Sequence, residues 1–315
     1  MQVRRSLAAA LSVGSILLAT ACASDDVSNP KAEDSSTGSG DQGTVHIAGQ
    51  NFGEATLLAA MYDELLTNAG YDTDVKLVDS RAAYIGTFPK TIDVVPEYVG
   101  GIVNELNARK NGADAKPFEA GDGQDLAKQG KSLLDEQGVT LLDLSSATDT
   151  NAFFVTKDYS ESEGVTKLSD LKGKSVVLAA NPDCEGRLDC EGGLTDDYGI
   201  DITKVLPLGY ASDQTYQSVL DGESQLGETS TTDGTLASQG LVVLDDDKQI
   251  QPAQNLVPAV GTEFLAAHPD VAQPLNDLMA ALTTEKLTEL NAKIAVDREK
   301  PEDVAHDFLT EAGLV

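Results

Sequence analysis

The sequence predicts an α/β fold in two lobes, with a ligand cleft between lobes that are joined by two crossings of the chain. From Thr44 onward, strand-like and helix-like hydrophobic patterns follow one another in the β-α-β order that favours a parallel sheet with crossover helices. A second series of strands and helices comes next, and the C-terminal tail is nearly all amphipathic helix. About 270 residues follow Thr44, which is enough for two lobes.

The two crossings are expected near Thr150 and near Asn255. One lobe then consists of residues 44–150 together with 256–315, and the other lobe consists of residues 151–255. In open α/β structures a small ligand binds in the crevice outside the strand ends. We therefore expect the ligand between the two lobes.

The elements of the first lobe are expected in the following order. A strand at 44–49 leads into a helix for which Asn51 is the N-cap, Glu54 lies at the capping-box position and Gly70 is the stop signal. Four further segments complete the lobe before the first crossing: strands within 74–79 and 91–99, and helices within 99–110 and 125–138.

The second lobe and the tail are expected to continue the alternation. Extended chain covers 139–159, a short helix and a buried strand cover 167–180, a helix covers 215–224, and a strand followed by a Pro-marked extended segment covers 241–260. The stretch "GETSTTDGT" at 227–235 is interpreted as a plain turn or as a polar loop that fixes a ligand.

Residues 1–21 have the pattern of an export signal. Arg4 and Arg5 precede an apolar run from Leu7 to Ala19, which is shorter than the ~20 residues of a membrane span. The run ends in "ATAC", so we expect Cys22 to be lipidated and the protein to be extracytoplasmic, anchored to the cell membrane as a lipoprotein. The alternative is an ordinary secretory signal in which Cys22 has no role. Residues 22–43 are rich in Ser, Gly and Asp and predict a disordered tether.

Composition and motifs exclude several classes of function. The formal net charge of −30 argues against nucleic acid and against an anionic membrane surface as partners. No nucleotide-binding loop, nucleophile elbow or zinc-protease motif is present. The three histidines, His46, His268 and His306, lie far apart in the sequence. We therefore expect a protein that is not an enzyme and uses no cofactor.

Two cysteines remain in the body, Cys184 and Cys190. In an exported protein so close a pair predicts a disulfide, and a metal site would need more ligands.

Aromatic and polar residues gather where predicted strands meet helices. Phe52 stands at a helix start, where it either packs in the core or forms a cleft wall beside free N–H groups. Tyr98 follows a strand in "VVPEYVGG", where a buried turn tyrosine is the alternative to a ligand contact. "TNAFF" puts Asn151 and Phe153 at the first expected crossing.

Seven segments in order, among them "NFGEATLLAAMYDELLTNAGY", "IDVVPEYVGGIVN", "EGRLDCEGGLTDDYGI" and "YQSVLDGESQLGETSTTDGTL", resemble the substrate-binding lipoproteins of osmoprotectant importers of the ABC class. That family binds glycine betaine, carnitine, choline and proline betaine. The resemblance implies a periplasmic-binding-protein fold (type II-like) that closes like a hinge, and an ABC permease and ATPase complex as partners. It also implies a cage of aromatic rings around a quaternary ammonium group.

The resemblance implies roles for individual residues. Tyr98 matches the tyrosine of the Pro-Glu-Tyr motif, Phe153 falls where a tyrosine is frequent, and Arg187 matches a basic residue that could pair with a carboxylate. The complete predicted ligand site is Phe52, Glu54, Tyr98, Asn151, Phe153, Arg187, Thr232 and Asp233.

The chain departs from the family pattern at Val95, where a first tyrosine is usual, and aromatic residues are scarce throughout. The ligand thus stays open between a quaternary amine and another zwitterion such as ergothioneine or an amino-acid derivative. A ligand-sensing lipoprotein of the same fold is the alternative to a transporter component.

Overall fold

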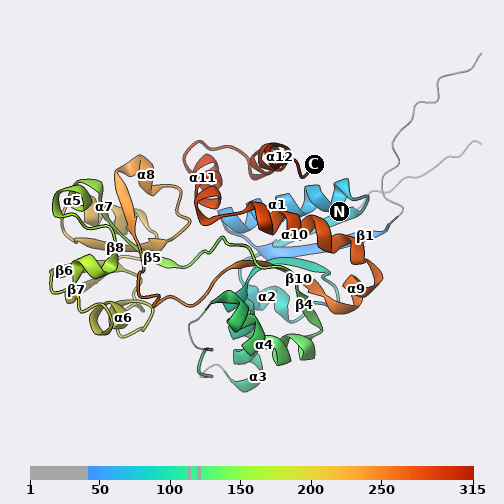
Figure 1. Cartoon of the computed structure of the whole chain (residues 1–315), viewed down its shortest axis with the longest axis horizontal. Coiled ribbons are helices and arrows are strands. Elements are labelled where there is room, and N and C mark those ends of the chain that lie inside the picture. The colour runs from blue at the N-terminus through green and yellow to red at the C-terminus, as the bar shows by residue number, and fades with distance from the viewer. Residues whose placement is uncertain (1–41, 113–114, 119–121) are drawn as a thin grey trace, which may run out of the picture. The chain divides into compact units, whose positions relative to one another are not determined.

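Two five-stranded sheets, each covered by helices, make up the part of the chain that the computed structural model describes, residues 42–112, 115–118 and 122–315 (Figure 1). These residues belong to one compact unit, Ser39–Val315. The predicted signal, the lipidation site at Cys22 and nearly all of the predicted tether lie outside the described residues. No helix among the described residues is long and apolar enough to cross a bilayer.

The first sheet has the strand order β2 (Asp72–Val78), β1 (Thr44–Gln50), β3 (Val94–Tyr98), β10 (Leu256–Gly261) and β4 (Val139–Leu141). The strands β2, β1 and β3 are parallel, as the β-α-β order predicts, whereas β10 is antiparallel to both of its neighbours. The strand β10 enters this sheet only after the chain has passed through the second sheet, and its antiparallel direction is not indicated by the β-α-β pattern.

The second sheet repeats this arrangement with the order β7 (Asp201–Pro207), β6 (Ser175–Ala180), β8 (Leu226–Ser230), β5 (Asn151–Thr156) and β9 (Leu241–Leu244). Here β7, β6 and β8 are parallel, and β5 is antiparallel to β8 and β9. The stretch "GETSTTDGT" is therefore not a turn throughout: Gly227–Ser230 belong to a central strand, and the loop begins at Thr231.

Helices cover both faces of the first sheet (Figure 1). One face packs against α1 (Gly53–Asn68), α10 (Ala272–Ala281), α11 (Thr284–Ala295) and α12 (Pro301–Ala312). The other packs against α2 (Arg81–Ile85), α3 (Val99–Asn111) and α4 (Gly123–Gln137), and α9 (Thr262–Ala267) and a 3₁₀ turn, η2 (Pro269–Val271), follow β10. The predicted helical spacing in α1 is what buries Leu57, Leu58 and Met61, each at most 1% exposed.

Shorter helices surround the second sheet: α5 (Lys157–Glu163), η1 (Leu168–Leu171), α6 (Glu191–Asp196), α7 (Asp213–Leu220) and α8 (Leu236–Gln239). Two of them begin at a hydroxyl cap. Thr156 accepts a hydrogen bond from the backbone N–H of Tyr159, and Ser212 accepts one from that of Thr215. The Ser212 cap fixes the start of α7 on the side of the sheet that carries the cavity residues, whereas the Thr156 cap lies at the other end of β5.

The two crossing segments, residues 142–150 and 245–255, run side by side. Thr148 and Asn255 form an antiparallel bridge, and the backbone N–H of Asp149 donates to the carbonyl of Gln254 at 3.2 Å. All strands of the first sheet come from 44–141 and 256–261, and all strands of the second come from 151–244. This is the two-lobed α/β fold with two crossings.

Candidate functional site

A cavity of about 590 Å³ lies between the start of α1, the helix α11 and the loops of the second sheet. Its lining includes one residue of the first crossing, Asp149. The remaining lining side chains and backbone come from Phe52, Gly53, Glu54, Tyr210, Ala211, Tyr216, Ser230, Thr232, Asp233, Gly234, Thr235, Asn291, Ile294 and Ala295. Among the described residues, no lysine, arginine or histidine lines this cavity, whereas three carboxyl groups do.

Glu54 is held at the wall of this cavity by hydrogen bonds from two elements. Its carboxylate accepts from the Tyr98 hydroxyl at 2.5 Å and from the Asn291 side-chain amide at 2.7 Å. Burial raises the pKa of Glu54, and these donors oppose that effect. Glu54, which the sequence analysis placed both at a capping-box position and in the ligand site, is therefore a buried acid at the cavity wall. The N-cap of α1 is Phe52 and not Asn51.

Tyr98 lies directly behind the lining. Its ring stacks on that of Phe52 with the centroids 6.5 Å apart, and its hydroxyl bonds to Glu54. Tyr98 itself is 6% exposed and does not line the cavity, whereas Phe52 is 41% exposed and does. Tyr98 thus supports two lining residues, and Phe52 presents the ring.

Asp149 is a buried acid that sequence reasoning missed. Its Oδ1 atom has no hydrogen-bond partner among the described residues. Burial, followed by the nearby charge of Glu54, raises the pKa of Asp149 to about 7, while the hydroxyls of Thr232 and Ser230 act in the opposite direction. A buried carboxylate with one unpartnered oxygen is costly, so this group favours a positively charged or hydrogen-donating ligand.

The loop after β8 supplies Thr232 and Asp233, the two loop residues that the sequence analysis selected. Asp233 accepts from the hydroxyls of Tyr216, Thr229 and Thr235 and from the backbone N–H of Thr235. With its oxygens occupied by these donors, Asp233 holds the loop in shape. The backbone carbonyl of Thr232 accepts from the Asn291 amide at 3.0 Å, which ties the loop to α11.

Three more lining residues escaped the sequence analysis. Tyr210 follows β7 at a junction between a strand and a helix, so the criterion that selected Tyr98 would also have found it, whereas Tyr216 lies inside α7. Asn291 lies within a regular amphipathic helix, and nothing in its sequence context distinguishes it.

Arg187 and Asn151 lie beside a smaller neighbouring cavity of about 240 Å³, which shares Asp149 and Tyr210 with the main one. The Arg187 guanidinium donates two bonds to Asp189, from Nε at 2.9 Å and from Nη2 at 2.7 Å. The side-chain amide of Asn151 also donates to Asp189, at 3.3 Å. Arg187, the predicted partner of a ligand carboxylate, and Asn151, another predicted ligand-binding residue, are therefore bonded to the same side chain of the protein.

Phe153 does not reach either cavity. It is 1% exposed and packs in the core on one face of the second sheet with Leu168, Leu178 and Leu244, while alternation along β5 turns Phe154 into the core on the other face. The ring that the family pattern suggested as a cage wall is a core residue here.

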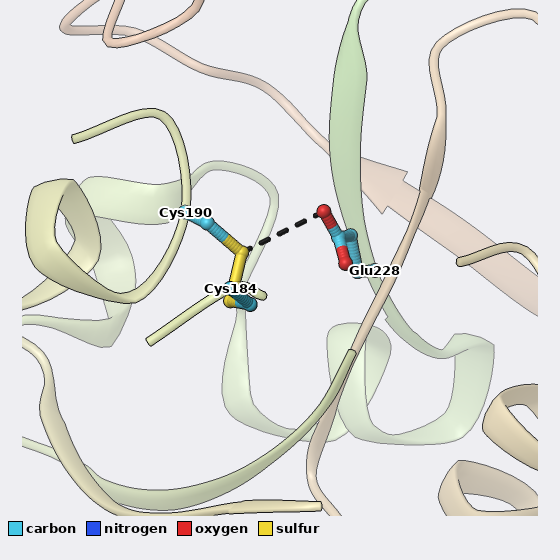
Figure 2. Close-up of side chains that lie close together, drawn as sticks. All are labelled: Cys184, Cys190 and Glu228. Atoms are coloured by element: carbon cyan, nitrogen blue, oxygen red, sulfur yellow. Dashed lines mark hydrogen bonds between the residues drawn. A yellow bond between two sulfur atoms is a disulfide. The ribbon is translucent and has the colours of Figure 1, made fainter. Parts of the chain in front are cut away.

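Cys184 and Cys190 are joined by a disulfide, which closes the loop that carries Arg187 and Asp189 (Figure 2). The carboxyl of Glu228 lies 3.6 Å from the Cys190 sulfur, and Figure 2 shows the three side chains together. These three groups could form part of a metal site only after reduction, since a disulfide offers no thiolate. Burial raises the pKa of Glu228, and the backbone N–H of Asn181 donates to it at 2.8 Å.

Comparison with known proteins identifies the family of the chain. The family model described as the substrate binding domain of ABC-type glycine betaine transport systems matches residues 43–311. The chain is 27% identical to a glycine-betaine-binding protein of Pseudomonas aeruginosa, over 86% of this chain and 89% of that protein. It is 29% identical to the glycine betaine-binding protein YehZ of Escherichia coli, over 70% of this chain and 74% of that protein.

Among solved structures, that of a glycine betaine/carnitine/choline ABC transporter protein superposes with a TM-score of 0.74 at 21% identity, over 86% of this chain and 98% of the other. This likeness shows the periplasmic-binding-protein fold. Since the family model covers most of the chain, including every residue of the cavity, the protein belongs to the family of substrate-binding domains of ABC-type glycine betaine transport systems.

Proposed function

We propose that the protein is the solute-binding component of an ABC importer and that it captures a small quaternary-ammonium osmoprotectant in the cavity beside Asp149. The importer's permease then receives the solute. The observation that carries this proposal is the combination of exposed rings and buried acids in one cavity, with Phe52 and Tyr210 beside Glu54 and Asp149.

This combination suits a cation without N–H groups. A quaternary ammonium ion cannot donate ordinary hydrogen bonds, so it is held by the faces of aromatic rings and by negative charge, and each cation–π contact is worth up to about 2 kcal/mol when desolvated. Phe52 and Tyr210 are 41% and 40% exposed, which leaves their rings accessible to such a ligand. We propose Phe52, Glu54, Asp149 and Tyr210 as direct contacts and Tyr98, Thr232 and Asp233 as their supports.

The proposal concerns binding and not catalysis. Relatives that match most of the chain are named as binding proteins. Among the described residues, the cavity lining has no cysteine or histidine that could serve as nucleophile or base beside the carboxyl groups.

A thermal-shift screen of the mature body tests the proposal with glycine betaine, choline, carnitine, proline betaine, ergothioneine and amino acids as probes. We expect at least one quaternary amine to raise the melting temperature, since a ligand at a hundredfold excess over its Kd stabilises the folded state by about 2.7 kcal/mol. Phe52→Ala should reduce the shift. Leu220→Ala is the matched control, because Leu220 is also 41% exposed and lies outside the cavity. A screen without any shift from a quaternary amine would refute the proposal.

We further propose that Cys22 anchors the protein to the outer face of the cell membrane through a lipid, after removal of the signal at 1–21. The support is the sequence pattern that ends in "ATAC". Metabolic labelling with a fatty acid tests this: the wild type should incorporate label and Cys22→Ser should not. If the wild-type protein incorporates no label and its signal is cleaved at a position other than before Cys22, the proposed lipid anchor is contradicted.

A further inference from the structure

We infer that Asp189 is a specificity-determining residue. Its carboxylate binds the Arg187 guanidinium, so that the site binds a quaternary-ammonium alcohol such as choline more tightly than the corresponding quaternary-ammonium carboxylate, glycine betaine. The inference rests on the proposed function. Choline and glycine betaine make the comparison, because they share a trimethylammonium group and differ at the other end, which is a hydroxyl in choline and a carboxylate in glycine betaine. The groups of the protein near that other end decide between them.

The first argument is that the cation which could bind a ligand carboxylate is already paired. Arg187 forms a two-pronged interaction with Asp189 and a further ion pair with Asp183 at 2.9 Å. These acidic partners raise the pKa of Arg187, so it keeps its charge and stays attracted to them. Asn151, the other candidate donor, bonds to Asp189 as well. The Asp189 carboxylate thus occupies the donors of Arg187 and Asn151 in the smaller cavity, which shares Asp149 and Tyr210 with the main one.

The second argument concerns hydrogen bonding inside the cavity. Two lining atoms lack a partner among the described residues, Asp149 Oδ1 and Asn291 Oδ1, and both are acceptors when Asp149 is ionised, the form that a bound cation favours. Choline has one O–H group to donate, whereas glycine betaine has no donor at all. A site whose unpartnered groups are acceptors discriminates in favour of the ligand that can donate.

The third argument is electrostatic. The main cavity contains Glu54, Asp149 and Asp233, and its lining has no basic side chain among the described residues. A ligand of net charge +1 is attracted by these groups along its whole length. A zwitterion is attracted at one end and repelled at the other, and the repulsion is strong where water is excluded.

The start of α1 could be thought to favour a carboxylate, because Gly53 and Glu54 offer free N–H groups there and Phe52 provides no side-chain cap. The same turn, however, carries the Glu54 carboxylate. An alcohol oxygen can accept from these N–H groups without adding a negative charge next to Glu54 and Asp149. This end of the helix therefore accommodates choline at least as well as glycine betaine.

Isothermal titration of the mature body with choline and with glycine betaine tests the inference. For the wild type we expect choline to bind at least about tenfold more tightly, the discrimination that one unpaired buried polar group brings. Tighter or equal binding of glycine betaine would overturn the inference and leave the proposed function intact. If neither these nor other quaternary amines bind, the proposed function fails together with it.

Variants separate the role of Asp189 from that of the cavity acids. Asp189→Asn should release the two-pronged interaction with Arg187 and reduce the preference for choline several-fold, mainly by strengthening the binding of glycine betaine. Asp183→Asn is the matched control: it removes the other acidic partner of Arg187, which lines neither cavity, and should leave the preference unchanged. An unaltered preference in Asp189→Asn, with wild-type stability in urea, would refute the role of Asp189. The wild-type comparison tests the preference even if a variant does not fold.

Discussion

Burial makes the ionised form of Asp149 unfavourable, and this makes the binding of a cation dependent on pH. Its carboxyl pKa rises from 3.8 to about 7 on folding, so between these pH values the ligand-free protein holds a proton that the unfolded chain has lost. The contribution of this group to stability is therefore present below pH 4 and is lost as the pH rises through 7. A bound cation favours the ionised form and reverses this preference.

We expect the Kd of choline to be about tenfold higher at pH 6 than at pH 8, because the proton on Asp149 must leave when the cation binds. The pKa of the neighbouring Glu54 is raised as well, so its proton also opposes cation binding at low pH. Of the other groups that line the cavity near Asp149, Asp233 raises the pKa of Asp149 further and Tyr210 is neutral. Titration calorimetry in buffers of different ionisation enthalpy measures both the Kd and the released proton. Asp149→Asn should flatten the profile, and a wild-type Kd that is constant from pH 6 to 8 would contradict this account.

The Tyr98 hydroxyl is a second residue whose removal has a defined consequence. Tyr98→Phe keeps the ring stacked on Phe52 but takes one hydrogen bond from the buried Glu54 carboxylate. We expect a loss of about 1–3 kcal/mol in the free energy of unfolding at pH 8, the usual cost of an unmatched buried charge-assisted bond. Urea denaturation measures this. A variant as stable as the wild type would show that Asn291 alone satisfies Glu54.

At the scale of elements, the turn from β3 into α3 is held by a buried ion pair. The Arg81 Nε donates to both carboxylate oxygens of Glu97, at 2.9 and 3.0 Å, and Glu97 also accepts from the Tyr84 hydroxyl and from the backbone N–H of Tyr98. Glu97 is 1% exposed. This network fixes the end of the strand from which Tyr98 projects.

Removal of Arg81 should therefore cost more than removal of a surface charge. We expect Arg81→Met to lower the free energy of unfolding by about 3–5 kcal/mol, because it leaves the Glu97 charge buried and unpaired. The double variant Arg81→Met with Glu97→Gln should recover part of this loss. Denaturant unfolding of the two single variants and the double variant gives the coupling energy, and strict additivity would mean that the pair is not coupled.

The two glycines after Tyr98 lie in a helix that the sequence predicts, but the contacts that require glycine there come from other segments of the chain. Gly100 and Gly101 lie in the first turn of α3, within the helix that the sequence predicts over 99–110. A Cβ on Gly100 would lie 2.5 Å from the carbonyl of Ala253, and one on Gly101 would lie 2.3 Å from the Arg81 guanidinium. These close contacts involve segments far away in the chain, so the local sequence reveals the glycines but not their purpose.

The same reasoning explains which site residues could be predicted. Phe52, Glu54, Thr232 and Asp233 were accessible from the sequence because they stand at ends of elements, where side chains point toward a cleft. Phe153 was misleading because the position in its strand, and not its residue type, decides which face it occupies. Asp149 and Asn291 become part of the site only through the packing of the crossing and of α11, which no local pattern encodes.

At the scale of the whole molecule, the net charge of −30 should speed the approach of a cationic ligand. A field of one sign attracts oppositely charged ligands, and salt screens it beyond about 8–10 Å at 0.10–0.15 M ionic strength. We expect the association rate constant of choline to fall roughly three- to tenfold between 0.02 and 0.5 M NaCl. Stopped-flow tyrosine fluorescence can follow this, since the chain has no tryptophan. Glycine betaine, with no net charge, is the control, and equal salt dependence for both would contradict electrostatic steering.

The antiparallel course of the two crossings has a consequence for how such a protein can be rebuilt. The second sheet is one uninterrupted stretch of chain whose entry and exit lie next to each other at the bridge between Thr148 and Asn255. A stretch bounded in this way can be exchanged as a cassette with only two splice points. A chimera that keeps the first sheet and its helices and receives residues 151–244 from a relative would change the Arg187 side of the site while retaining Phe52 and Glu54. The two halves of the binding site can thus be exchanged independently of each other.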